Sequence, residues 1–208
     1  MKILFIDTET NGLPLNKYAP YTITEYWPFI IQISWQIIDS DSWSVIKEED
    51  LFIKPRGKWN SEAERIHQIP ESIANKFGKE PREILDKLYS DIQQSTIIVA
   101  HNLSFDKTVI LAEIQRIWET GEYKYRPNDL WRKDIREMCT MRLSKELCGL
   151  QFKNSTDLKF PTLGELYAKL FNKVYDISGS SLHNSKHDVS CLAMCFKQLI
   201  DEGHISIE

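Results

Sequence analysis

The sequence predicts an α/β fold in which a mixed β-sheet is flanked by helices. Runs rich in β-branched and aromatic residues lie near the amino end, where they are typical of strands. Amphipathic segments with helical spacing follow them and alternate with one or two further strands. Three strands followed by helices that alternate with strands is the order expected of an α/β sandwich with a mixed sheet.

The strands are predicted from short apolar runs bounded by turn residues. These segments are residues 2–6, 29–38, 43–53 and 96–100. Asp39 to Ser42 makes a hairpin turn between the second and third strands. Residues 14–28 contain three prolines and little periodicity, which favours a loop or a small excursion from the sheet.

The helices are predicted from apolar residues at helical spacing. They span residues 61–67, 70–77, 81–94, 103–118, 162–171 and 185–202. Thr162 is expected to cap its helix, with Glu165 in the capping-box position. Residues 121–134 are polar, aromatic and basic, and we expect a loop there.

Length and composition are those of one ordinary globular domain. The chain has 208 residues, of which 42% are hydrophobic and 27% charged. No apolar run approaches the ~20 residues of a membrane span, so we expect a soluble, cytoplasmic protein without a membrane partner. The four cysteines form no CxxC pair and are interpreted as buried small side chains in a reducing compartment.

Acidic residues stand where predicted elements begin or end. Asp7 and Glu9 follow the first strand and, being two residues apart on an extended chain, should project to the same side. Asp106 and Asp188 lie in the first turns of predicted helices. Each has a structural interpretation alone, either an exposed turn or favourable contact with a helix dipole. Together, their oxygens favour hard cations such as Mg²⁺ or Mn²⁺.

The sequence contexts of these acids are more specific than the acids themselves. The segments FIDTETNGL (5–13), HNLSFD (101–106) and HNSKHD (183–188) resemble, in this order, the three motifs of the DEDDh exonuclease family. IHQIP (66–70), CTMRLS (139–144) and TLGELYAKLF (162–171) are similar to the segments between them. This DnaQ-like group has a ribonuclease H-like fold. The resemblance covers nearly the whole chain and implies one exonuclease domain, residues 1–208, folded as a three-layer sandwich.

The resemblance also implies the roles of site residues. Two divalent cations, Mg²⁺ or Mn²⁺, would be held by Asp7, Glu9, Asp106 and Asp188. His183, five positions before Asp188, would be the general base of the histidine-type subclass. Contacts to the terminal nucleotides are expected from Thr10, Leu13, Asn102 and Phe105. Ser185 departs from the alanine usual in the family, and we expect little consequence.

Several residues keep two interpretations. His187 is a competing base, whereas His101 is expected to be structural, and His67 and His204 structural or at the surface. The aromatic residues of the 14–28 excursion either stack on single-stranded bases or pack beneath the loop; they are Tyr18, Tyr21, Tyr26 and Trp27. The basic stretch from Lys124 to Arg136 either follows a phosphate backbone or is a solvated loop.

The predicted function is a metal-dependent 3′–5′ exonuclease that releases nucleoside 5′-monophosphates. Single-stranded DNA is favoured because many family members degrade DNA, which suggests a proofreading or repair enzyme and makes a DNA polymerase a candidate partner. The alternatives are an exoribonuclease that trims RNA or short oligoribonucleotides, and a non-catalytic, polymerase-associated binding module. The net charge of −4 argues against a nucleic-acid binder unless metal ions neutralise several of the acids.

Overall fold

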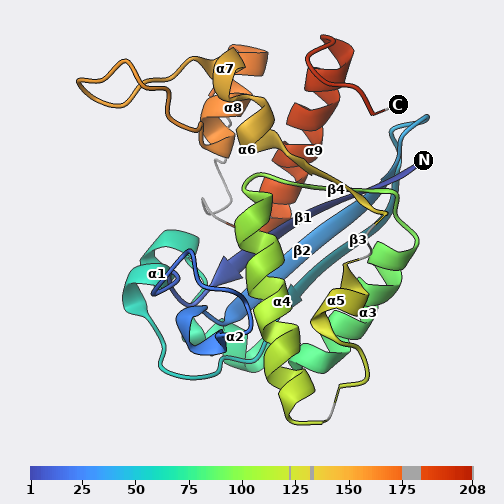
Figure 1. Ribbon diagram of the computed structural model, residues 1–208, viewed down its shortest axis with the longest axis vertical. Coiled ribbons are helices and arrows are strands. Elements are labelled where there is room, and N and C mark those ends of the chain that lie inside the picture. Colours follow the sequence, from blue (N-terminus) through green and yellow to red (C-terminus); the bar gives the residue numbers. More distant parts are fainter. Residues whose placement is uncertain (122, 132–133, 175–183, 208) are drawn as a thin grey trace.

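A five-stranded sheet forms the centre of the computed structural model, which describes residues 1–121, 123–131, 134–174 and 184–207 (Figure 1). The strands are β1 (Lys2–Thr10), β2 (Ile30–Asp39), β3 (Val45–Phe52), β4 (Ile97–Ala100) and β5 (Arg136–Cys139). Their order across the sheet is β3-β2-β1-β4-β5. β2 is antiparallel to β1 and β3, whereas β4 is parallel to β1 and β5 is parallel to β4. The predicted mixed sheet is therefore confirmed.

Helices cover both faces of this sheet. They are α1 (Ser61–His67), α2 (Glu71–Phe77), α3 (Pro81–Gln93), α4 (Leu103–Glu119), α5 (Pro127–Leu130), α6 (Thr140–Leu143), α7 (Lys145–Cys148), α8 (Leu163–Phe171) and α9 (Ser185–Asp201), with a 3-10 turn η1 (Thr24–Tyr26). In Figure 1, α4 crosses in front of the sheet and α9 lies behind it. This arrangement is the three-layer sandwich expected of a ribonuclease H-like fold. Among the described residues, no helix is both long and apolar enough to cross a bilayer.

The alternation of side chains along β1 builds two cores. Leu4 and Ile6 point to the face of α3 and α4, where they join the larger buried cluster. Ile3 and Phe5 point to the opposite face and pack with Phe196 of α9. Because successive strand residues face opposite sides, Asp7 and Glu9 continue the row that faces α9. The strand thus determines on which side of the sheet the acids lie.

The predicted boundary of the first strand is wrong. β1 continues to Thr10 because its pairing with β2 continues, with Asp7 opposite Ser34 and Glu9 opposite Gln32. Both acids therefore lie within the strand itself, near its carboxyl end, rather than in a loop after it. Inter-strand hydrogen bonds fix their backbone, which a loop would not do.

The 121–134 segment is not simply a loop. It contains α5, and its aromatic residues Tyr123 and Trp131 are buried in the main core. Tyr125 stacks on Tyr89 of α3, with ring centroids 3.7 Å apart. These packing contacts join segments far apart in the sequence, which local periodicity does not report.

The other local predictions fare well. Thr162 and Glu165 form the expected capping box at the start of α8. Of the cysteines, Cys191 and Cys195 are fully buried, while Cys139 and Cys148 are partly exposed. The prediction of buried cysteines thus holds for the pair on α9.

Candidate active site

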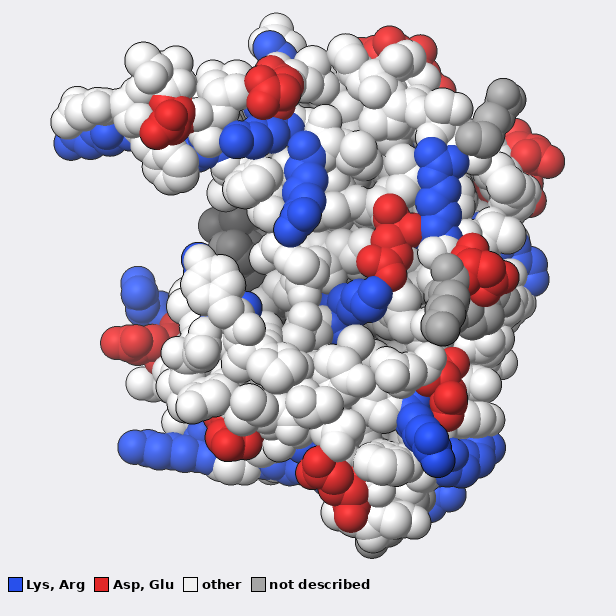
Figure 2. Space-filling view, in the orientation of Figure 1, with Lys and Arg blue, Asp and Glu red and all other residues white. Residues whose placement is uncertain are grey.

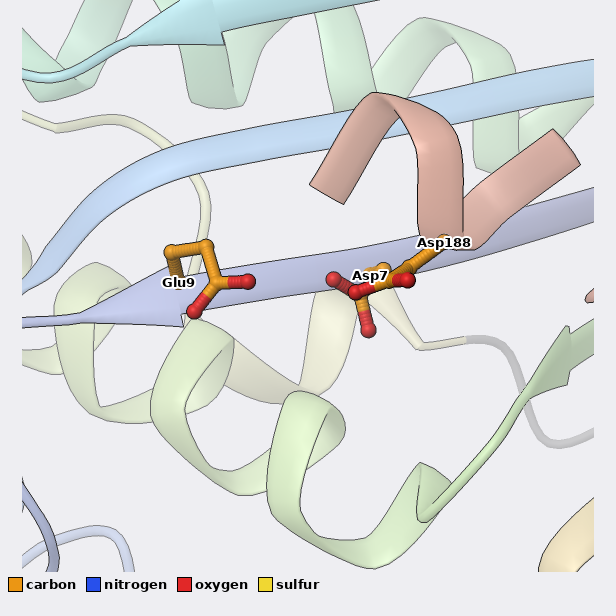
Figure 3. A group of neighbouring side chains, drawn as sticks. All are labelled: Asp7, Glu9 and Asp188. Atoms are coloured by element: carbon orange, nitrogen blue, oxygen red, sulfur yellow. The ribbon is translucent and has the colours of Figure 1, made fainter. Parts of the chain in front are cut away.

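Three carboxylates meet where β1 ends and α9 begins. Asp7 and Glu9 project from the same face of β1, and Asp188 comes from the first turn of α9 (Figure 3). Their ligand atoms all lie within 4.8 Å of one another. The side chain of Asn184 caps α9 by accepting a hydrogen bond from the Lys186 amide at 3.1 Å. The capped helix therefore presents Asp188 to the two strand acids at its amino end.

Asp106 approaches the same strand from the opposite face of the sheet. It lies in the first turn of α4 and is 4% exposed. Its Oδ1 accepts hydrogen bonds from the amide of Thr8 (3.1 Å) and from the Thr8 hydroxyl (2.8 Å). Thr8 points away from Asp7 and Glu9, so Asp106 adjoins the group of three acids without being one of them.

The electrostatics of the group reflect its crowding. Burial, followed by the charges of Asp188 and Asp106, raises the pKa of Glu9 to about 9. The pKa of Asp7 is raised well above its usual range by burial and then by its three acidic neighbours. Burial also raises the pKa of Asp106 to about 7, although the hydrogen bonds from Thr8 oppose this. A divalent cation among these oxygens would remove both the repulsion and the desolvation penalty.

The donor set fits a hard divalent cation. All three clustered ligands are carboxylates, and Mg²⁺ and Mn²⁺ prefer such oxygens. A typical zinc site would include histidine or cysteine ligands. Among the described residues, neither residue type belongs to this group. The structure thus brings together Asp7, Glu9 and Asp188 of the four predicted ligands and places Asp106 beside them.

Of the histidines considered in the sequence, His67 is buried and His101 is partly buried, and both are hydrogen-bonded. His183, the predicted general base, lies outside the described residues. His101 is structural, as predicted, because its ring nitrogens lie 2.9 Å from the Thr140 hydroxyl and 2.9 Å from the carbonyl of Pro161. Burial lowers the pKa of His101. His67 is also buried, and its Nδ1 accepts a hydrogen bond from the amide of Ile69. His187 stays an untested alternative as the base.

A pocket of about 320 Å³ adjoins Glu9. Three of the four predicted substrate residues line it, namely Thr10, Leu13 and Phe105. Leu13 is 83% exposed, whereas Thr10 is buried and donates to the carbonyl of Gly12 at 2.7 Å. Asn102 is absent from the lining. It occupies the turn into α4 with a φ of 124°, a backbone conformation unusual for a residue with a Cβ.

The opposite wall of this pocket comes from α1. It consists of Asn60, Glu62, Ala63, Ile66 and His67. None of these residues was predicted to contact substrate, although the IHQIP segment (66–70), which overlaps the end of this wall, resembles a segment of the family. A larger hollow of about 560 Å³ lies between α4, β5 and α6, but none of the clustered acids lines it.

Hydrogen bonds with charged side chains of α4 hold the segment that follows Leu13, up to the start of β2. Glu113 is fully buried and accepts hydrogen bonds from the Ile30 amide and from Arg116, each at 3.0 Å. Arg116 in turn donates to the carbonyls of Thr24 and Trp27. Breaking a buried ion pair of this kind is costly, so the excursion has a defined position beside the pocket.

The two interpretations of the aromatic residues in the 14–28 excursion can now be compared. Trp27 is 7% exposed and belongs to the main core, and Tyr21 is partly buried and packs against that core. Of the two interpretations, packing beneath the loop therefore holds for these two rings. Tyr18, at 83% exposed, and Tyr26, at 37%, keep accessible rings.

The described part of the basic stretch from Lys124 to Arg136 does not border the acids. It leads into β5 at the amino end of that strand, whereas Asp7 and Glu9 lie at the carboxyl end of β1. β1, β4 and β5 are parallel, so these positions are at opposite ends of the sheet. On the face shown in Figure 2, basic and acidic side chains alternate and do not gather into one basic surface.

Comparison with known proteins identifies the kind of fold. A family model described as Exonuclease, that of ribonuclease T, matches residues 4–196. No curated protein matches the chain. Among solved structures, E. coli Exonuclease I in complex with a dA16 oligonucleotide has a TM-score of 0.70 at 19% identity. That match covers 96% of this chain and 41% of the other.

Two further solved structures have the same fold. The moderately thermophilic Exonuclease I of Methylocaldum szegediense has a TM-score of 0.72 at 15% identity, covering 97% of this chain and 41% of that one. A product-bound exonuclease I has a TM-score of 0.71 at 19% identity, covering 96% and 43%. The chain spans about two fifths of the length of these proteins.

We predict that the metal-free fold loses stability as the pH rises. Glu9 has a folded-state pKa of about 9, above its unfolded value of ~4.3. Its stabilising contribution is therefore complete below ~pH 4.3 and is lost as the pH rises towards 9. In EDTA, the melting temperature should fall between pH 5 and pH 9, and Glu9→Gln should reduce that fall. Thermal melts across this range test the prediction.

In EDTA at pH 8 we expect Glu9→Gln to be more stable than the parent, and divalent cations should reverse this order of stability. At a concentration 100 times the dissociation constant, a cation stabilises the parent by ~2.7 kcal/mol, or roughly 5–11 °C. Glu9→Gln should gain less. Glu146→Gln, on the exposed face of α7, is the matched control and should follow the parent. A Glu9→Gln protein less stable than the parent at pH 8 in EDTA would contradict the interpretation.

Proposed function

The chain belongs to the DEDDh-type exonuclease family, and on this basis we propose that it degrades single-stranded DNA from the 3′ end, releasing nucleoside 5′-monophosphates. The observation that carries the proposal is the meeting of Asp7, Glu9 and Asp188 within 4.8 Å at the end of the sheet. The similar solved structures include E. coli Exonuclease I in complex with a dA16 and with a dT13 oligonucleotide, which favours DNA over RNA. A polymerase partner and a role in replication or repair stay predictions.

The chain's acids would hold two divalent cations, Mg²⁺ or Mn²⁺. When bound, such cations lower the pKa of an attacking water and neutralise the leaving oxygen of a phosphodiester. Asp7 would be the ligand shared by both cations, as the family resemblance implies. Asp106 would complete the set with Oδ2, because Thr8 occupies its Oδ1.

Other residues of the chain would orient the substrate and move the proton. His183 directly precedes the capping residue of α9 and would accept the proton of the nucleophilic water, a task suited to an imidazole. This assignment rests on the motif in the sequence. Thr10, Leu13 and Phe105 would hold the terminal nucleotide in the adjoining pocket. Asn102, which does not line this pocket, stays a predicted contact from the family resemblance.

The two alternative functions predict different behaviour. An exoribonuclease would use the same acids, because the metal chemistry does not depend on the 2′-hydroxyl of the sugar. A binding module would not require a crowded acidic group, which destabilises the fold unless cations are present. The acidic group therefore favours catalysis.

The direct test uses matched DNA and RNA oligonucleotides labelled at the 5′ end. We expect a ladder that shortens from the 3′ end in Mg²⁺ or Mn²⁺ and disappears in EDTA. The DNA should be shortened faster. His183→Ala should lower kcat by ~10²–10⁴-fold, because it removes the general base. If neither oligonucleotide shortens, the exonuclease proposal fails for the isolated chain; faster shortening of RNA would make it an exoribonuclease.

The role of Leu13 can be tested separately. Leu13→Ala should raise KM for an oligonucleotide roughly 5–30-fold with little change in kcat, because ~1–2 kcal/mol of apolar contact with a base is lost. Leu15→Ala is the matched control, since Leu15 lies in the same excursion, is 80% exposed and does not line the pocket. Steady-state kinetics on both variants decide the matter. Equal KM values for Leu13→Ala and Leu15→Ala would exclude the contact.

A further inference from the structure

A stripe of buried polar side chains runs along the central strand β2. Gln32, Ser34 and Gln36 are 0%, 1% and 6% exposed, although the residues between them, Ile33 and Trp35, form apolar core. The register places Ser34 opposite Asp7 and Gln32 opposite Glu9. Directly opposed residues of antiparallel strands project to the same face. The stripe therefore lies beside the strand acids and under the amino end of α9.

Buried polar groups need hydrogen-bond partners, and here the partners form a closed ring. The Ser34 hydroxyl donates to Asp50 of β3 at 2.8 Å and lies 2.6 Å from the hydroxyl of Ser185. The side-chain Nε2 of Gln32 donates to the same Asp50 oxygen at 2.8 Å. The side-chain Oε1 of Gln32 accepts a hydrogen bond from the backbone amide of Ser185 at 3.4 Å. The four residues thus connect β2, β3 and the first residue of α9.

The direction of the serine contact follows from counting protons. A hydroxyl has one proton, and that of Ser34 is donated to Asp50. The Ser185 hydroxyl must therefore donate to Ser34, and it has a fixed orientation. The expectation that Ser185 would have little consequence is not supported by these contacts, since the residue is fully buried and bonded through both its amide and its hydroxyl.

The ring is placed to control Asp188. Ser185 precedes Asp188 by three residues, so the two lie on neighbouring positions of the same side of α9. A shift or rotation of the first turn would move the Asp188 carboxylate relative to Asp7 and Glu9, which are held by the strand. The alanine usual at this position in the family could not make the hydroxyl contact.

We propose that Ser185, Ser34 and Asp50 are positioning residues that fix the first turn of α9 so that Asp188 meets Asp7 and Glu9. This proposal rests on the proposed function, in which these acids hold divalent cations. The ring touches no substrate or reacting atom. Its effect is therefore expected in metal affinity, and through it in kcat at low metal concentration, with KM for the oligonucleotide unchanged.

The test measures Mn²⁺ binding directly by electron paramagnetic resonance of the free ion. Ser185→Ala and Ser34→Ala should each weaken Mn²⁺ binding about 3–30-fold. The double variant should bind Mn²⁺ only slightly more weakly than the single variant with the lower affinity, because each single substitution already breaks the contact between the two hydroxyls. The kcat deficit should shrink as Mn²⁺ is raised. Asp50→Asn, which keeps the shape of the side chain, gives an independent measurement should a serine variant fold poorly.

Ser190→Ala is the matched control. Ser190 lies one turn further along α9 and accepts a hydrogen bond from Gln36 at 3.1 Å, outside the ring. The Ser190→Ala variant should bind Mn²⁺ with the affinity of the parent. Parental affinity in Ser185→Ala, Ser34→Ala and Asp50→Asn would overturn the proposal, and so would an equal loss in Ser190→Ala, which would indicate general loosening of α9. A parent that binds Mn²⁺ no better than Asp7→Ala would refute the proposed function itself, and the positioning role with it.

Discussion

Mutual repulsion between carboxylates is the constraint on which this end of the molecule depends. Asp7, Glu9 and Asp188 are held close enough to share a cation, with Asp106 beside them. Burial and the charges of the neighbouring acids raise the pKa values of Asp7 and Glu9, and this opposes folding unless a cation or protons compensate. The surrounding structure must therefore impose their positions, because the side chains would separate if they were free to move.

The fold imposes those positions from three directions. β1 holds Asp7 and Glu9 through its ladder with β2, and its alternation turns Thr8 to the other face, where it binds Asp106. The capped first turn of α9 brings Asp188 across the sheet. The polar stripe of β2 lies beneath that turn, where an apolar strand face would be expected. The four acids are thus attached to three rigid elements, β1, α4 and α9, which hold them in a defined arrangement.

The sequence was most informative where the signal is local. Residues two apart on a strand share a side, and this alone predicted that Asp7 and Glu9 would project together. The extension of β1 to Thr10 was missed because pairing with β2 determines it. The burial of Tyr123 and Trp131 was missed for a similar reason, since they join a core cluster built from distant segments that include α3 and α4. The polar ring around Ser34 was also beyond a sequence argument, because it joins three segments up to 153 residues apart.

The central claim is that Asp7, Glu9 and Asp188 form a divalent-cation site on an exonuclease fold. Anomalous diffraction from crystals grown with Mn²⁺ and thymidine 5′-monophosphate tests it most directly. The account predicts manganese density in contact with all three carboxylates, and a second peak adjoining Asp7 and Asp106 when the nucleotide is bound. Well-ordered crystals with no manganese density on these carboxylates, or with manganese held elsewhere on the chain, would contradict it.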